Sequence, residues 1–107
     1  MKQQTQLIRQ FNITSKYRGY YLIIDAIEIA YKNQHQCLHI TKDIYPIIAR
    51  KHNISSRSVE KNIRTIVEKC WENNRELMQE VAGCKLTCCP TNSEFIDYVS
   101  YYILKEN

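Results

Sequence analysis

Apolar residues recur at intervals of three and four along most of the chain, which is the spacing of one face of an α-helix. The stretch "NISSRSVEKNIRTIVEKCW", residues 53–71, shows this most clearly. Its apolar stripe consists of Val59, Ile63, Ile66, Val67 and Cys70. The opposite face carries Arg57, Ser58, Lys61, Arg64, Thr65 and Glu68. The apolar stripe predicts packing against a core, and the polar face needs an explanation of its own.

The same periodicity predicts further helices on both sides of this stretch. We expect six helices, over residues 2–11, 20–33, 41–53, 56–71 or 72, 73–83 and 91–107. The scarcity of Gly and Pro, two of each, argues against a β-sandwich with many tight turns. With 107 residues and no linker of low complexity, the chain is expected to be a single all-α domain over 1–107, a compact six-helix unit.

Capping residues sharpen the helix ends around the opening stretch. Thr41 is a candidate N-cap for the third helix, with Pro46 tolerated in its first turn. Asn53 accepts the left-handed geometry that ends a helix. Ser55 or Ser56 then caps the fourth helix. The two helices are thus joined by a tight turn.

The sixth helix begins with a T-x-x-E capping box, formed by Thr91 and Glu94. Its first backbone N–H groups, at Asn92 and Ser93, suit a phosphate as well. The sequence leaves two interpretations open, a box that only caps the helix and a box that also binds phosphate.

Residues 44–71 therefore form a helix, a turn and a second helix. Ala49 is small where the helices would pack closely, Asn53 lies in the turn, and Ile54 and Val59 follow as apolar positions. This order resembles the general helix-turn-helix pattern, in which the second helix enters the major groove of DNA. The candidate base-reading residues are Ser58, Glu60, Lys61 and Asn62. The candidate phosphate contacts are Arg50, Lys51, Ser55, Ser56, Arg57, Arg64, Thr65, Asn92 and Ser93.

The charge distribution supports a polyanionic partner. Residues 41–70 hold seven basic and three acidic residues, whereas the rest of the chain holds eight of each, so the whole net charge of +4 falls in this segment. Polar helix faces are also common simply because they meet water, and Glu60 sits at the flank, where it could pair with Lys61 or Arg64. Both interpretations of the polar face remain, and the turn signature favours double-stranded DNA.

Other function classes find little support. The five cysteines match no zinc spacing, with or without the three histidines, and are expected to be reduced thiols without a metal or cofactor. No phosphate loop or nucleophile motif indicates an enzyme or a small-molecule substrate, and Cys70 with His52 lacks a supporting group. The longest apolar run, residues 20–24, is too short for a membrane span. We expect a cytoplasmic, nucleoid-associated protein.

Five segments resemble one known family, the C-terminal effector domain of the master response regulator of sporulation in Bacillus and Clostridium relatives. The matching segments are "GYYLIIDAI" (19–27), "ITKDIYPIIARKHN" (40–53), "VEKNIR" (59–64), "EKCW" (68–71) and "PTNSEFI" (90–96). The resemblance covers nearly the whole chain. It implies a six-helix domain of the winged-helix-like DNA-binding superfamily that contains a helix-turn-helix. It also implies a transcription factor that binds short operators, often as tandem copies, and contacts RNA polymerase and its sigma subunit.

The resemblance further implies which residues read bases. In the family, three recognition-helix positions do so in the pattern Arg-Val-Glu-Arg, which here is Ser58-Val59-Glu60-Lys61. Glu60 is retained, Lys61 keeps the charge without the bidentate fork of Arg, and Ser58 replaces the first Arg. We therefore expect an altered or relaxed operator preference.

The family's proteins also carry an N-terminal phosphoacceptor receiver domain, for which this chain has no room. We expect either an excised effector domain or a stand-alone protein without phosphorylation control. An alternative function is a helix-turn-helix that binds protein and antagonises a full-length regulator. Such a module would bind DNA weakly and another effector domain tightly.

Overall fold

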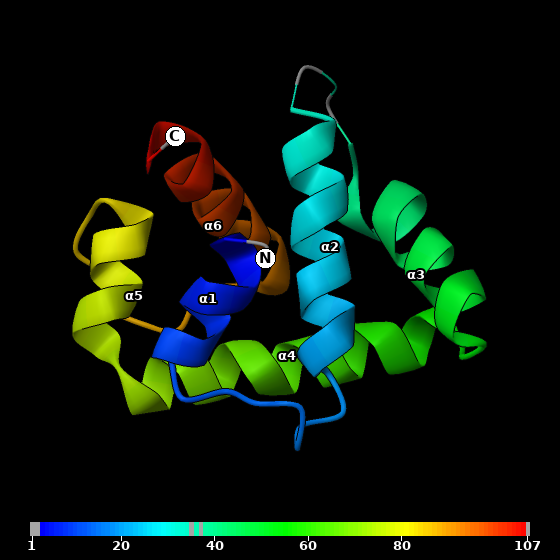
Figure 1. Cartoon of the computed structure of the whole chain (residues 1–107), viewed down its shortest axis with the longest axis horizontal. Coiled ribbons are helices and arrows are strands. Elements are labelled where there is room, and N and C mark those ends of the chain that lie inside the picture. Colours follow the sequence, from blue (N-terminus) through cyan, green and yellow to red (C-terminus); the bar gives the residue numbers. More distant parts are fainter. Residues whose placement is uncertain (1–2, 35, 37, 107) are drawn as a thin grey trace.

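The computed structural model describes residues 3–34, 36 and 38–106, and every regular element in this part of the chain is helical (Figure 1). In chain order the elements are α1 (Gln3–Gln10), α2 (Tyr20–Lys32), the π-helix η1 (Ile40–Ile44), α3 (Tyr45–His52), α4 (Ser56–Asn73), α5 (Arg75–Ala82) and α6 (Asn92–Glu106). The expected all-α class with six α-helices is thus confirmed. His35, one of the three histidines, and Cys37, one of the five cysteines, lie outside the described residues.

The other α-helices lie along one side of the longest helix, α4 (Figure 1). Figure 1 shows α1, α2 and α6 rising from α4, with α3 beside its first turns and α5 beside its last. The pair α2 and α6 has the most extensive contact of any two elements. One side of α4 is therefore covered along its length, and the other side stays at the surface.

The core fills the space between α4 and these helices. The apolar stripe foreseen on α4 is fully inside, because Val59, Ile63, Ile66, Val67 and Cys70 are all buried. Phe11 and Phe95 meet edge to face with their ring centroids 6.1 Å apart, which joins the end of α1 to α6. The burial of large side chains from every α-helix makes one continuous core.

Most helix ends lie where the capping residues place them. Ser55 caps α4, and its Oγ accepts a hydrogen bond from the N–H of Ser58 at 3.1 Å. Gly83 follows α5 with φ of 75°, the left-handed conformation that suits glycine. Thr91 and Glu94 form both bonds of a capping box, at 2.9 and 3.1 Å.

The predicted start of the third helix is wrong. Thr41 caps no α-helix; residues 40–44 form the π-helical turn, and α3 begins at Tyr45 with Pro46 in its first turn. Proline has no N–H to donate, and its ring crowds the carbonyl four residues earlier, so regular α geometry cannot continue through this point. The Asp43 carboxylate, which accepts from the N–H of His39 at 2.8 Å, holds the start of the wider turn.

Candidate nucleic-acid interface

The turn between α3 and α4 has the geometry that its sequence indicates. Asn53 is left-handed, with φ of 55° and ψ of 48°. The N–H of Ile54 returns to the carbonyl of Ala49 at 3.0 Å, so the chain reverses tightly after α3. Ser55 then starts α4. Three residues thus fix the angle between the two helices, an arrangement consistent with a helix-turn-helix.

Contacts with α2 fix α3 in place. The Asp25 carboxylate accepts from Lys51 Nζ at 3.1 Å and lies 2.7 Å from Nε2 of His52. Ala49, at 8% exposed, and Val59, fully buried, belong to the core where α3 meets α4. Lys51, a candidate phosphate contact, is therefore engaged with α2, although its side chain remains 63% exposed. Arg50 beside it is exposed.

The outer face of α4 carries a basic and hydroxylic stripe. Ser56, Arg57, Lys61 and Thr65 are all exposed, and the spacing of the last three places them on adjoining turns of one face. The Thr65 hydroxyl donates to the carbonyl of Lys61 at 3.2 Å. No carboxylate belongs to this stripe among its first three turns. The stripe lies opposite the buried one, so it is the part of α4 that a partner can reach.

Three of the candidate base-reading residues lie deeper. Ser58, Glu60 and Asn62 are half-buried, and the Asn62 amide donates to the carbonyl of Ser58 at 2.8 Å. This bond turns the Asn62 side chain back along its own helix. A base contact by Asn62 would therefore require a change of rotamer, whereas Lys61 is exposed as it stands.

Glu60 pairs with Arg64, one of the two partners that the sequence left open. The Arg64 Nη2 and Glu60 Oε2 atoms form a salt bridge one turn apart on α4. The side chain of Glu60 is 32% exposed and that of Arg64 is 58% exposed, so both still reach the surface. Glu60 therefore orients the guanidinium of Arg64 and offsets its charge.

Asn92 differs most from its expected setting. Its side chain is 9% exposed, and its amide Nδ2 donates to the Tyr45 hydroxyl at 2.9 Å and to the carbonyl of Glu60 at 3.1 Å. The Asn92 side chain thus joins α6 to α3 and α4, and only its backbone N–H could meet a phosphate. Ser93, next to it, is exposed. Capping by Thr91 and Glu94 is present, and the phosphate interpretation stays a prediction.

Buried Tyr45 remains neutral where it accepts the Asn92 amide. Burial raises its pKa, and the nearby Glu60 charge also raises it, while the bond to Asn92 acts in the opposite direction. The phenol therefore serves as a structural contact at neutral pH.

The periodicity predicts a connector between α1 and α2 but not its position: residues 11–19 run beside α4. At one end the Asn73 side chain donates to the carbonyl of Phe11 at 2.9 Å. At the other end a Cβ on Gly19 would lie 2.4 Å from the carbonyl oxygen of Asn62, so only glycine allows this approach. Lys16 and Arg18 are exposed on the connector.

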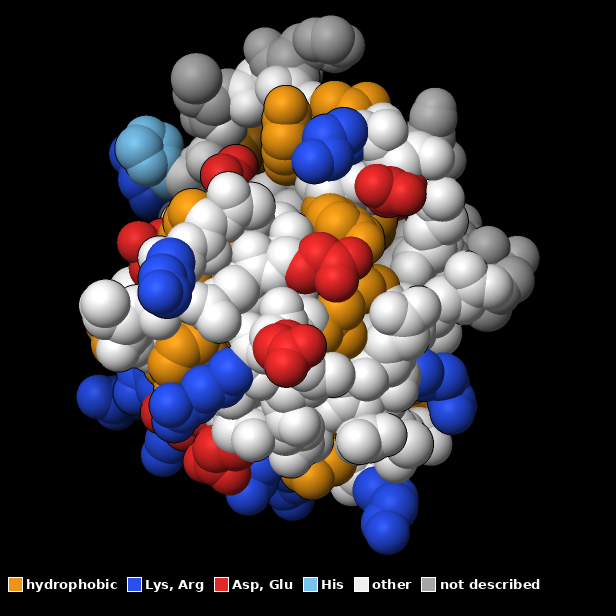
Figure 2. Space-filling model, turned by 90° about the vertical axis from the view of Figure 1, so that its left-hand side faces the viewer, with side chains coloured by type: hydrophobic (Ala, Val, Ile, Leu, Met, Phe, Trp, Pro, Cys, Tyr) orange, Lys and Arg blue, Asp and Glu red, His pale blue; other side chains and the backbone are white. Residues whose placement is uncertain are grey.

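A finer charge count would have found this segment. Residues 1–24 contain four basic and no acidic residues, while residues 71–107 contain three basic and six acidic ones. These opposite excesses cancel when everything outside 41–70 is counted together. Figure 2 shows the separation on the face formed by α5 and α6, where acidic side chains lie across the middle and Lys and Arg gather along the lower edge, at the level of α4.

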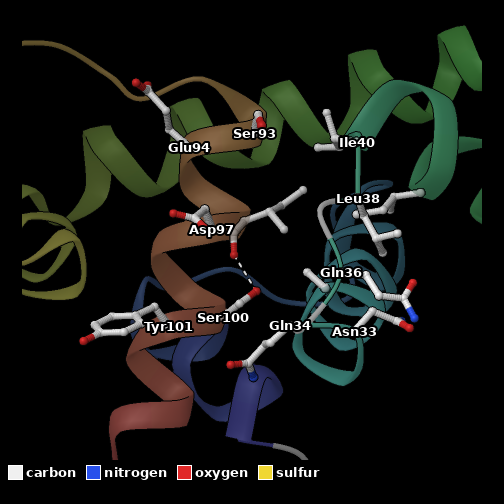
Figure 3. A pocket seen from close by; sticks show the side chains of 13 residues that line it. Asn33, Gln34, Gln36, Leu38, Ile40, Ser93, Glu94, Asp97, Ser100 and Tyr101 are labelled. Carbon is white, nitrogen blue, oxygen red and sulfur yellow. Dashed lines mark hydrogen bonds between the residues drawn. The ribbon is translucent and has the colours of Figure 1, made fainter.

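Two hollows adjoin the site without suggesting catalysis. One, of about 360 Å³, lies between α4 and the start of α6, with Glu60, Arg64 and Glu68 in its wall. The other, of about 460 Å³, separates α6 from the segment after α2. Figure 3 shows Glu94, Asp97 and Tyr101 of α6 on one side and polar Asn33 and Gln34 on the other. The carboxylates Glu94 and Asp97 disfavour a phosphate in the second hollow, whereas the first hollow also has Arg64 and the start of α6 in its wall.

The cysteines of the described residues form no disulfide, and no three metal-ligating side chains converge there. Cys70 is fully buried, and burial raises the pKa of its thiol, with the neighbouring Cys89 adding to the effect. A raised pKa disfavours the thiolate that a nucleophile needs. The helices of the described residues also include no segment long and apolar enough to cross a bilayer.

Comparison with protein families identifies the domain that this geometry belongs to. A family model described as "Sporulation initiation factor Spo0A C terminal" matches residues 4–103, which is nearly the whole chain. The match includes α3, the turn and all of α4, together with the capping box of α6.

Proposed function

The chain belongs to the family of sporulation initiation factor Spo0A C-terminal domains, and from this premise we propose that α4 reads an operator in the major groove of DNA. The family is one of DNA-binding effector domains of sporulation response regulators, and not a family of enzymes. The proposal concerns the recognition helix and its contacts in this chain.

The exposed basic stripe of α4 is the observation that carries the proposal. Arg57, Lys61 and Thr65 lie on one outer face, next to a turn that Asn53 and Ser55 hold in a fixed geometry. A recognition helix reads bases with residues near its N-terminus, and this face begins in the first turn of α4. Lysine can donate to the O6 and N7 acceptors of guanine, while arginine at the groove edge can meet phosphate.

We assign the other candidates by their setting. Ser58, Glu60 and Asn62 are half-buried along the edges of the stripe and would read bases at its margins. The exposed residues Arg50, Ser56 and Ser93 would contact phosphates of the DNA backbone, as would the main-chain N–H of Asn92. Arg64 and Lys51 would do so after release from their salt bridges with Glu60 and Asp25. Ser55 already accepts within the chain, so its contribution would be its cap.

The test is fluorescence anisotropy with a labelled duplex carrying tandem copies of the family's operator, beside a scrambled duplex, over a salt series. We expect tighter binding to the operator, with log K falling linearly against log salt at about 0.9 per phosphate engaged. Equal and feeble binding to both duplexes, with little salt dependence, would contradict the proposal.

The operator preference has its own test, because the resemblance predicts arginine at two positions of α4. Restoring that pattern with Ser58→Arg and Lys61→Arg should sharpen discrimination at the affected base pairs by about 1–3 kcal/mol each. Comparing all single-base variants of the operator for the wild type and the double variant measures this. Identical base profiles would show that these two positions do not set the preference.

Exposed apolar side chains favour a second candidate, a module that binds protein. Ile47 and Ile54 are 44% and 38% exposed, and both belong to the α3–turn segment. Under this alternative the chain would antagonise a full-length regulator. Tight association with a purified effector domain, together with salt-insensitive DNA binding, would favour it.

Further partners follow from the family and not from the geometry. We propose tandem binding of two copies on DNA, contact with the sigma subunit of RNA polymerase, and a place on the nucleoid in the cytoplasm. We propose on the same ground that this effector domain acts in nature either with a receiver domain or as a stand-alone protein. Size-resolved analysis of the complex on one and two operator copies would test the tandem arrangement.

A further inference from the structure

The connector of residues 11–19 follows one flank of α4 closely. Its contacts fall on Asn62, Ile66 and Asn73, which share one side of the helix. The eleven residue-to-residue steps from Asn62 to Asn73 span about 16 Å at 1.5 Å per step, or nearly five base steps of 3.4 Å. The connector is therefore a second, parallel element beside the proposed recognition helix.

Groove dimensions place such an element against the DNA backbone. An α-helix with its side chains is about 10–12 Å across, and the major groove is about 12 Å wide. A helix in the groove fills it, so a segment packed alongside that helix meets the wall of the groove. The wall consists of phosphates.

The connector has the chemistry that phosphates require. Lys16 and Arg18 are exposed, hydroxyl-bearing Ser15 is exposed beside them, and no acidic residue occurs in residues 1–24. The opposite flank of α4 differs, because Glu60 and Glu68 line the hollow there together with Arg64. Of the two flanks of α4, only the one covered by the connector has exposed cations and a packing segment, residues 11–19, without a carboxylate.

We propose that the connector is a DNA-backbone contact, in which Lys16 and Arg18 engage phosphates of the strand that borders α4 on this side. This inference rests on the proposed function, since it requires α4 to lie in the groove. It assigns the connector affinity and orientation on DNA but no part in sequence choice. Gly19 contributes by letting the connector approach α4.

The test compares the double variant Lys16→Gln/Arg18→Gln with a matched control, Lys85→Gln/Lys105→Gln. The control removes the same charge from two exposed residues, one in the loop after α5 and one in the last turn of α6. Anisotropy titrations with the operator and scrambled duplexes over a salt series give the affinity and the salt slope for each protein. Circular dichroism melts confirm that all variants fold.

We expect the connector variant to bind both duplexes more weakly by the same factor, with its operator preference unchanged. Its salt slope should fall by about 2 in magnitude, at about 0.9 per phosphate lost. The conservative variant Lys16→Arg/Arg18→Lys should restore the slope, and the matched control should keep it.

Two outcomes would overturn the inference, and they are distinguishable. If the wild type shows salt-dependent, operator-preferring binding and the connector variant has the slope of the control, the connector is not a contact while the proposed function stands. If the wild type itself lacks such binding, the proposed function fails and the connector assignment fails with it.

Discussion

The two sides of the molecule differ in charge and in how their surfaces are used. On one side lie the connector, α3, the turn and α4, which we call the basic side, residues 11–19 and 45–73. On the other side lie α5, the following loop and α6, which we call the acidic side, residues 74–106. The acidic side carries five carboxylates against three basic residues. On the basic side Glu60 pairs with Arg64 and Glu72 pairs with Lys69.

This contrast teaches that a net charge describes a small domain poorly. A chain with a net charge of +4 is only mildly basic. Its charges are nevertheless divided between two opposed regions of a molecule about 30 Å across. A polyanion approaching the basic side meets a charge density that the total hides, and the acidic side repels it. Charge separation of this kind orients the encounter with DNA before any base is read.

Neutralising one side at a time tests the contrast most strongly. The double variant Arg57→Gln/Lys61→Gln on the basic side should weaken operator binding about a hundredfold, since each lost contact costs roughly 1–3 kcal/mol. The pair Glu76→Gln/Glu80→Gln on the acidic side should change it by less than about threefold, because those exposed charges are on α5, beside the last turns of α4 (Figure 1), and salt screens exposed charges over about 10 Å. Anisotropy at 0.1 M salt measures both. Similar losses in the two variants would mean that the sides are not functionally distinct.

We call the contact between the two sides the seam. At the seam, the Asn92 side chain of α6 donates hydrogen bonds to Tyr45 on α3 and to the carbonyl of Glu60 on α4. Asn92→Ala leaves both groups without this donor, so the free energy of unfolding should fall by about 2 kcal/mol. Urea denaturation measures the change. Exposed Ser93→Ala is the neighbouring control and should stay within about 0.5 kcal/mol of the wild type. A loss of equal size in both variants would remove Asn92 from its role at the seam.

Close contact of the connector with α4 makes Gly19→Ala the next test. The added Cβ would lie 2.4 Å from the backbone of Asn62 and 2.7 Å from Ile66, so the connector must shift away from the helix. We expect a loss of about 1–2 kcal/mol in the free energy of unfolding, as overpacking of this kind usually causes. Gly83→Ala, where a Cβ has open space around it but φ is positive, separates crowding from backbone strain. Unaltered stability in Gly19→Ala would show that the connector does not pack tightly on α4.

Periodicity and capping chemistry predicted most of the fold, because these signals are local. The buried stripe of α4, the Ser55 cap, the left-handed Asn53 and the capping box of α6 all depend on residues within one or two turns of each other. The π-helical turn before α3 was missed because Thr41 offers a cap that Pro46, five residues later, makes unusable.

Long-range contacts limited what could be predicted about the site. The burial of Asn92 depends on a partner 47 residues away, and no local pattern indicates it. The position of the connector likewise follows from bonds to Asn73 and from the close approach at Gly19, which only the packed structure reveals. The exposed stripe of α4, in contrast, follows from the wheel position of Arg57, Lys61 and Thr65, and it was predicted correctly as the outer face.

The close packing around Cys70 at the seam gives the smallest predicted effect, a change of stability with pH. Cys70 of α4 is fully buried close to Cys89 of the loop before α6, and burial raises the pKa of the Cys70 thiol above its ordinary value. In the unfolded chain this thiol ionises near pH 8.5, whereas in the folded protein it stays protonated, so the unfolded state binds fewer protons in that range. The stability that Cys70 contributes is therefore present in full below pH 8.5 and is lost as the pH rises.

Between pH 8.5 and 9.5 this loss should amount to about 1 kcal/mol in the free energy of unfolding, since a full proton difference is worth 1.36 kcal/mol per pH unit. Urea denaturation of the wild type and of Cys70→Ala across this range isolates the effect, because all other titrating groups are shared. The wild-type curve should fall more steeply than that of Cys70→Ala, and exposed Cys84→Ala should follow the wild type. Parallel curves for the wild type and Cys70→Ala would mean that water reaches the thiol, and that the two sides of the molecule meet through a hydrated seam instead of a packed one.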